Sequence, residues 1–142
     1  KLLHALGPAL RTALFSRLDP RAKLGAHTGW SDLSNHVLRL HIPLVVPGGK
    51  YSNKINNNMK DDNMNSYNIG LCGTWVDGCI ETHEEGSVVS FDGSKVHRAF
   101  NYSDEDRIVL IIDLARPRGL PMGTATGGHS DELDEFINSI VD

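Results

Sequence analysis

The side chains best suited to metal chemistry in this sequence are its seven histidines, and two of them lie in informative places. His27 lies in the segment 25–29 (GAHTG), just before the first clear strand pattern, and His97 lies in an apolar segment that follows Asp92-Gly93. Neutral imidazole is a common ligand for iron and zinc. A lone histidine is more often a surface or packing residue, so neighbouring residues must decide its role. The other five are His41, which lies in a strand pattern, His4, in a predicted terminal helix, and His36, His83 and His129, which we expect to face solvent.

Two arginines lie on predicted strands in positions that suit anion binding. Arg39 and His41 share one face of an alternating segment, and Arg107 shares a face with Asp113 on another. An inward-facing charge is costly unless it is paired or bound to a ligand, and guanidinium groups bind carboxylates in a planar, bidentate way. Two imidazoles and two guanidinium groups could therefore hold a metal ion and a dicarboxylate together. Asp113 could orient a ligand or make a structural hydrogen bond.

Composition limits the class of protein. The chain has 142 residues, which suffices for one domain with one core. Its 39% apolar and 23% charged content is typical of globular proteins. The net charge of −4 gives no positive field for nucleic acid, so we expect no nucleic-acid partner. The longest apolar runs are far shorter than the roughly 18 residues that suggest a membrane span, so none is predicted.

The two cysteines leave two interpretations open. Cys72 and Cys79 lie seven positions apart across Gly73 and Gly78. They could be free thiols, or they could form a disulfide across a hairpin; two cysteines are too few for a disulfide scaffold. Their spacing does not match a zinc-binding CxxC motif.

The first half of the chain predicts a helix, a strand and a long loop. Leucines at roughly helical spacing predict a short helix within residues 1–15, interrupted at Gly7-Pro8. Residues 37–46 alternate and predict a strand, in which Pro43 indicates an edge position or an irregularity in the ladder. The Asn-rich segment 48–70 is typical of a surface loop or insertion.

The second half predicts an antiparallel sandwich or barrel. Short apolar segments are separated by turn residues, and the strands expected from them cover 71–76, 87–91, 96–100 and 107–114. Ser130 is a candidate N-cap for a C-terminal amphipathic helix over about 130–141. We therefore expect one domain over residues 1–142, with a mainly β core at about 15–117.

Several of these segments, taken in order, resemble one known family. The stretches are His27-Thr28-Gly29, Leu38-Arg39-Leu40-His41, Glu85-Gly86, Ser90-Phe91-Asp92, His97, and Arg107 through Asp113 to Pro117, and they resemble the aspartyl/asparaginyl β-hydroxylase family. The resemblance implies a double-stranded β-helix, or jelly roll, and a dioxygenase dependent on Fe(II), 2-oxoglutarate and O2. Such an enzyme would hydroxylate a C–H bond of a peptidyl Asp or Asn, or of a related small-molecule or acyl substrate, and release succinate and CO2.

The resemblance also implies roles for individual residues. His27 and His97 would be the catalytic iron ligands. Arg107 and Ser16 would bind the distal carboxylate of 2-oxoglutarate, and Arg39 and His41 the end that chelates iron. Gly29 stands where a His-x-Asp motif would place a carboxylate. The family likewise lacks that carboxylate, and Asp32 is a weaker candidate for a substitute.

Two other functions remain open from the sequence. The first is a catalytically inactive jelly-roll domain that binds a metabolite or a partner. The second is a zinc-dependent hydrolase or isomerase, although two histidines without a third protein ligand make a poor zinc site. A peptide or small-molecule partner fits each reading, whereas localisation and oligomeric state are not predicted by these features.

Overall fold

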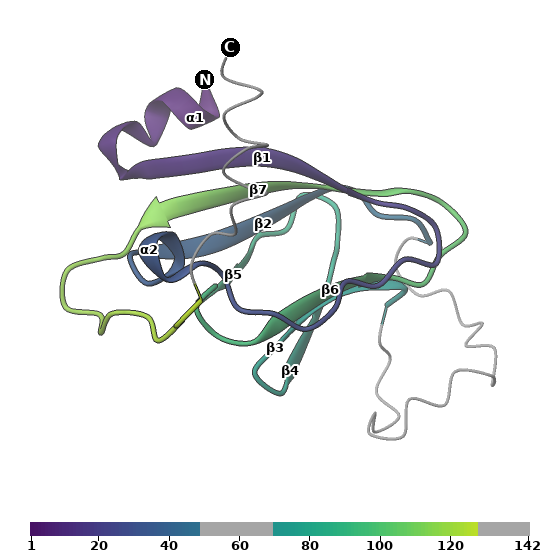
Figure 1. Ribbon diagram of the computed structural model, residues 1–142. Helices are drawn as coiled ribbons and strands as arrows, with labels where there is room; N and C mark the ends of the chain where they lie inside the picture. Colours follow the sequence, from purple (N-terminus) through teal and green to yellow (C-terminus); the bar gives the residue numbers. More distant parts are fainter. Residues whose placement is uncertain (49–69, 128–142) are drawn as a thin grey trace, which may run out of the picture.

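The computed structural model describes residues 1–48 and 70–127, and its main feature is a pair of facing antiparallel sheets (Figure 1). The predicted Asn-rich loop and the predicted helix at 130–141 lie almost wholly or wholly outside the described residues. The mainly β, jelly-roll fold class expected from the sequence is confirmed. The elements are α1 (Leu2–Ala5), a 3-10 turn (Gly7–Ala9), β1 (Leu10–Leu18), α2 (Ser31–Ser34), β2 (Val37–Val45), β3 (Cys72–Val76), β4 (Cys79–Thr82), β5 (Val89–Phe91), β6 (His97–Asn101) and β7 (Arg107–Ala115).

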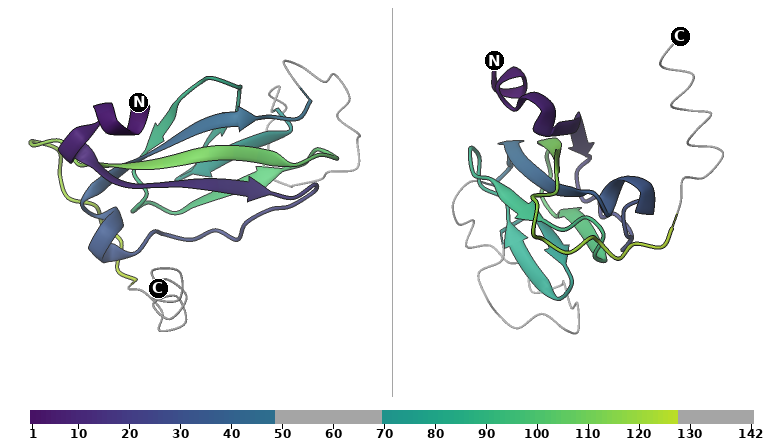
Figure 2. Two further views of the ribbon diagram at one scale, coloured as in Figure 1. Left: turned by 90° about the horizontal axis from the view of Figure 1, so that it is seen from above. Right: turned by 90° about the vertical axis from the view of Figure 1, so that its left-hand side faces the viewer.

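The two sheets have different sizes. The four-stranded sheet has the order β1-β7-β2-β5, and the three-stranded sheet has the order β4-β3-β6. Figure 2 shows β7 lying between β1 and β2 when the molecule is seen from above. The chain passes from one sheet to the other after β2, β4, β5 and β6, so each sheet combines strands that are distant in sequence.

The strands β2 and β7 position most of the polar interior, and they follow the alternation that the sequence predicts. Along β7, Arg107, Val109 and Asp113 are buried, and along β2 His41 and Pro43 are buried. The register of the β2–β7 ladder shifts between Pro43 and Val45. The sequence predicted either an edge position or a ladder irregularity at Pro43, and the structure shows the irregularity, because proline has no N–H to donate to the ladder.

The N-terminal prediction was wrong over most of its length. Only Leu2–Ala5 is α-helical, and residues from Leu10 to Leu18 form β1, which pairs with β7. The leucine spacing fits a helix, but alternate residues of β1 contact the interior: Thr12 and Ser16 bond to side chains of β7, and Leu18 is buried. Because these interior positions hold polar side chains, the alternation of apolar and polar residues that is typical of a strand is not visible in the sequence of β1.

A tight hairpin joins β3 to β4, a strand that the sequence analysis missed. Asp77 and Gly78 both have positive φ, of 45° and 93°, which is the geometry of a type I′ turn. Cys79 pairs with Val76 in the ladder, and the side chain of Cys79 is exposed while that of Cys72 is buried. Both cysteines are free, so the disulfide interpretation was wrong.

Candidate active site

The structure brings the two histidines singled out by the sequence side by side, with His97 buried and His27 exposed. His27 and His97 form an isolated antiparallel bridge, in which each backbone N–H donates to the other's carbonyl at 3.0 and 2.8 Å. Their ring centroids lie 4.4 Å apart. Seventy residues of sequence therefore separate two imidazoles that are neighbours in space.

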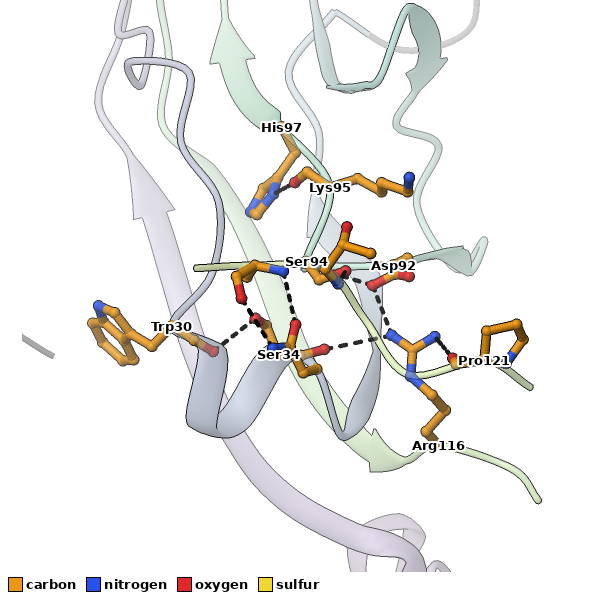
Figure 3. Close-up of polar contacts among 11 residues, drawn as sticks. Trp30, Ser34, Asp92, Ser94, Lys95, His97, Arg116 and Pro121 are labelled. Atoms are coloured by element: carbon orange, nitrogen blue, oxygen red, sulfur yellow. Dashed lines mark hydrogen bonds and ion pairs between the residues drawn. The ribbon is translucent and has the colours of Figure 1, made fainter. Parts of the chain in front are cut away.

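Each of these imidazoles is oriented by the same local contact. Nδ1 of His27 lies 2.8 Å from the carbonyl oxygen of Gly25, and Nδ1 of His97 lies 2.8 Å from that of Lys95 (Figure 3). A carbonyl accepts but cannot donate, so both rings carry their proton on Nδ1 and leave Nε2 with a free lone pair. Burial lowers the pKa of His97, although its bond to Lys95 acts in the opposite direction. Two Nε2 lone pairs are thus available for a metal.

Gly29 has no room for the carboxylate that many iron sites contain. A Cβ atom built on Gly29 would lie 2.7 Å from Cβ of Ser34 and 3.0 Å from the carbonyl oxygen of Gly93. Asp32, the substitute ligand considered above, is exposed on α2. Across residues 1–48 and 70–127, no group of three or more His, Cys, Asp or Glu side chains could hold a metal ion. A metal on His27 and His97 would therefore need other ligands from outside the described chain.

Arg39 is paired within the protein. Its Nε and Nη2 donate to Oδ1 and Oδ2 of Asp113 at 2.8 and 2.9 Å, a bidentate ion pair. Thr12 donates to the same carboxylate at 2.6 Å, and the Asp113 side chain has no solvent exposure. Of the two roles that the sequence left open for Asp113, this is the structural one. The charge of Arg39 is thus balanced within the fold, and Nη1 is the nitrogen that the pair does not use, so a role of Arg39 in binding the cosubstrate stays a prediction.

Arg107 differs, because the chain provides it with no carboxylate among the described residues. Its side chain is buried, with 1% exposure, and Nη2 donates to Oγ of Ser16 at 3.3 Å. Nε and Nη1 are buried and have no hydrogen-bond partner. Burial lowers the pKa of Arg107 to about 10, which still leaves the guanidinium protonated at neutral pH. A buried cation with two unused donors is the pattern expected of an anion site.

A second pair of histidines is buried in the same domain. His41 and His83 are both buried, and Oγ1 of Thr74 lies 3.2 Å from Nδ1 of His41 and 3.0 Å from Nε2 of His83. Phe91 packs edge-on against His41 and also contacts His97. The expectation that His83 faces solvent was therefore wrong. The strand alternation places His83 with the exposed Cys79 and Glu81, so no sequence pattern would have found it.

A polar cluster beneath His97 ties the site to the C-terminal part of the described chain (Figure 3). Arg116 donates to Asp92 at 2.7 Å, and Asp92 accepts from the backbone N–H of Ser94. Burial alone would raise the pKa of Asp92, but hydrogen bonds from Arg116 and Ser94 outweigh it and lower the pKa. The same cluster includes Ser34, which donates to the carbonyl of Trp30. The turn that leads into His97 is thus held by the side chain of Arg116 and by the backbone N–H groups of Gly29 and Thr124.

These features define a mainly β domain whose two sheets enclose a site with paired imidazoles and an unpaired guanidinium. The chain belongs to the aspartyl/asparaginyl β-hydroxylase family, because the model of the family described as "Aspartyl/Asparaginyl beta-hydroxylase" matches residues 1–117. It is therefore a member of a family of hydroxylases, which supports an enzymatic function.

Similar proteins include one curated relative and two solved structures. An ornithine lipid ester-linked acyl 2-hydroxylase of Rhizobium tropici is 33% identical over 114 residues, which is 80% of this chain and 33% of that protein. A predicted oxalate decarboxylase of Thermotoga maritima is 14% identical with a TM-score of 0.48, covering 80% of this chain and 73% of that one. A Cupin 2 conserved barrel domain protein of Salinispora arenicola CNS-205 is 13% identical with a TM-score of 0.43, covering 89% and 70%. Among the described residues, no helix has the length and apolar character to span a membrane.

Proposed function

We propose that this chain is a hydroxylase dependent on Fe(II), 2-oxoglutarate and O2. His27 and His97 hold the iron, Arg107 and Ser16 bind the distal carboxylate of 2-oxoglutarate, and Arg39 and His41 lie at its chelating end. The observation that carries the proposal is the buried guanidinium of Arg107, which has two unused donors in the interior that also contains His41 and His97. Removing it is a direct test.

The metal fit rests on the two imidazoles. Each has its proton fixed on Nδ1 by a backbone carbonyl, which is the usual way that proteins hold a histidine ligand in one tautomer and orientation. A site with two nitrogen ligands leaves several coordination positions for a chelating cosubstrate and for O2. Zinc sites of catalytic type generally have three protein ligands, so this donor set favours iron over zinc.

The cosubstrate fit rests on Arg107. A carboxylate accepts hydrogen bonds in a planar pair, which matches two adjacent guanidinium nitrogens. Nη2 carries two N–H groups, of which Ser16 accepts one, and the other can pair with the unused Nε–H or with the unused Nη1–H on one carboxylate. The hydroxyl of Ser16 keeps its own proton, which it can donate to the same carboxylate.

The protein's part in the reaction is binding, orientation and electrostatics. When bound, iron with 2-oxoglutarate supplies the activation of O2 that inserts one oxygen atom into a C–H bond, with succinate and CO2 as the other products. The bidentate pair with Asp113 keeps Arg39 rigid beside the imidazoles. Phe91 packs against both His41 and His97, so an apolar ring lies beside both imidazoles.

For the substrate, we propose an acyl chain rather than a peptidyl side chain. The curated relative is named as an acyl 2-hydroxylase of an ester-linked ornithine lipid, and its likeness extends over 80% of this chain. Because this chain spans only a third of that relative, the comparison supports the reaction class more directly than the identity of the lipid.

The experiment measures succinate from 2-oxoglutarate with purified protein, Fe(II) and ascorbate, in the presence of an acyl lipid or of an Asp-containing peptide. We expect succinate formation to be stimulated by the lipid, with oxygen from labelled O2 in the hydroxylated product. His97→Ala is expected to abolish turnover, and His36→Ala, at an exposed histidine outside the site, is the matched control. Stimulation by the peptide alone would contradict the substrate assignment. Iron binding that is unaffected by His97→Ala would contradict the metal site.

A further inference from the structure

One hydroxyl group joins the two buried histidines in the interior. Thr74 is 1% exposed, and its Oγ1 lies within hydrogen-bond distance of Nδ1 of His41 and of Nε2 of His83. His41 lies on β2, Thr74 lies on β3, and His83 is the residue that follows β4. Nothing in the family motifs quoted above includes Thr74 or His83, so this contact needs its own explanation.

A threonine oxygen donates one hydrogen bond and accepts up to two. If both rings donated to Oγ1 of Thr74, the buried hydroxyl proton would have no acceptor among the described residues, so with neutral rings two arrangements satisfy both contacts and also use that proton. In the first, Nε2–H of His83 donates to Thr74, and Thr74 donates to a bare Nδ1 of His41. In the second, every direction is reversed, and Nδ1–H of His41 donates to Thr74. The first arrangement puts the proton of His41 on Nε2, and the second leaves Nε2 of His41 without one.

We propose that His83 is a positioning residue that acts through Thr74 to hold His41 with its proton on Nε2, where it can donate to the cosubstrate carboxylate. This inference rests on the proposed function, because a carboxylate requires a donor. His83 is not itself a ligand of the cosubstrate in this proposal; it sets the direction of the hydrogen-bond chain.

The surroundings of His83 favour the same direction. Its Nδ1 is buried without a partner, and so are Nε and Nη1 of Arg107. The positive charge of Arg107 acts on His83, since it is one cause of the lowered pKa of that ring, after burial. A proton on Nδ1 would be a buried donor with no acceptor among the described residues, which proteins tolerate less well than an unpaired acceptor. With Nδ1 bare, the proton of His83 is on Nε2, which starts the chain toward Thr74 and His41.

Both rings also have to be neutral for the chain to work. Burial, followed by the charges of His83 and Arg107, lowers the pKa of His41 to about 2. Burial and Arg107 lower the pKa of His83 to about 4. At neutral pH each ring therefore carries a single proton, and the choice between Nδ1 and Nε2 is the remaining variable.

The first experiment determines the tautomers by nitrogen NMR on the full chain with labelled histidine. We expect both His41 and His83 to be protonated on Nε2, with signals assigned from His83→Gln and from the loss of the His41 signals in His41→Asn. Protonation of His41 on Nδ1 would overturn the proposal. This measurement needs neither iron nor 2-oxoglutarate, so it decides the direction of the chain even if the proposed function fails.

The second experiment measures the affinity for 2-oxoglutarate and the kinetic constants. Thr74→Val removes the hydroxyl at nearly constant volume, and we expect KM for 2-oxoglutarate to rise on the order of tenfold with little change in kcat. Thr74→Ser should restore the wild-type value. Thr82→Val makes the same change on β4 and is the matched control, for which no effect is expected.

His83 is tested in the same assay. His83→Leu should raise KM as Thr74→Val does, and His83→Gln, whose amide can replace Nε2–H, should restore much of the affinity. The double variant with Thr74→Val and His83→Leu should be no worse than either single variant, because both break one chain. If the wild type binds 2-oxoglutarate and both single variants bind it equally well, the inference fails while the proposed function stands.

Discussion

Two arginines point inward from neighbouring strands, and they differ in the partners of their guanidinium groups. Arg39 of β2 makes a bidentate pair with Asp113 of β7, and its side chain keeps 22% exposure. Arg107 of β7 is more deeply buried, and among the described residues its guanidinium donates to the hydroxyl of Ser16 alone. The charge of Arg39 is balanced by a carboxylate, whereas no carboxylate of residues 1–48 or 70–127 pairs with Arg107.

The difference shows how to separate a structural charge from a ligand site. A buried ion pair contributes little net stability, but removing one partner is costly, because the other charge is left unpaired. A buried charge without a partner destabilises the ligand-free protein and is retained only where a ligand compensates it. The two arginines should therefore respond in opposite ways to the same substitution.

The largest expected effect is on the paired arginine. Arg39→Met would leave the Asp113 carboxylate, which has no solvent exposure, without its cation. We expect the free energy of unfolding to fall by about 3–5 kcal/mol, measured by denaturant titration. Replacing both residues, Arg39→Met with Asp113→Leu, should recover most of the loss. A change in Arg39→Met of less than about 1 kcal/mol, the value typical of exposed ion pairs, would show that the pair is not structural.

The next effect concerns ligand binding at the unpaired arginine. Arg107→Met should weaken 2-oxoglutarate binding on the order of 100-fold, which corresponds to about 2.7 kcal/mol, because two charge-assisted hydrogen bonds are lost. Calorimetry on the wild type and the variant measures this directly. Arg118→Met, at an exposed arginine, is the control. Equal affinity in Arg107→Met and the wild type would remove the cosubstrate assignment.

The same variant should have a smaller effect of opposite sign on stability. In the absence of 2-oxoglutarate, Arg107→Met is expected to raise the free energy of unfolding by about 1–2 kcal/mol, because an uncompensated buried cation is replaced by an apolar side chain. The comparison with Arg39→Met, under identical denaturant conditions, is the test. If both variants lose stability, the distinction between the two arginines is wrong.

The smallest effect is on pH dependence. Burial and Arg107 lower the pKa of His83 from 6.5 to about 4, so the unfolded chain binds more protons than the folded one between these values. Stability is therefore complete above pH 6.5 and decreases as the pH falls, by up to about 1.4 kcal/mol per pH unit for each such ring. Denaturation from pH 7 to 5 should show a shallower slope in His83→Gln, with His36→Gln unchanged. An identical slope in His83→Gln would contradict the buried, neutral state of His83.

Much of the β core was predictable, because strands β2 and β7 alternate apolar and polar residues along their length. The strand β1 was not, since Thr12 and Ser16 face the interior to bond Asp113 and Arg107, and its leucines also fit a helical spacing. The interior position of the polar groups on β1 is visible only when its partner strand is known.

The sequence could predict which residues lie near the site, but it could not predict which of them contact one another. The spacing placed Arg39 and Asp113 on inward faces, yet their pairing depends on the register between β2 and β7. The burial of His83 depends on the position of the β3–β4 hairpin, and local alternation indicates the opposite. In both cases the missing information is a contact between strands distant in sequence.

The backbone from Arg116 to Gly127 has a practical consequence for anyone who isolates this domain. The family match ends at residue 117, but Ala125 exchanges two hydrogen bonds with the side chain of Asn35, and Gly127 accepts from the N–H of Ser31. Thr124 also donates to Ser94, three residues before His97. Trimming the protein at the family boundary would thus remove hydrogen bonds to the segments that precede His97 and follow His27. If such a fragment bound iron weakly, the result would not test the proposed role of the two histidines.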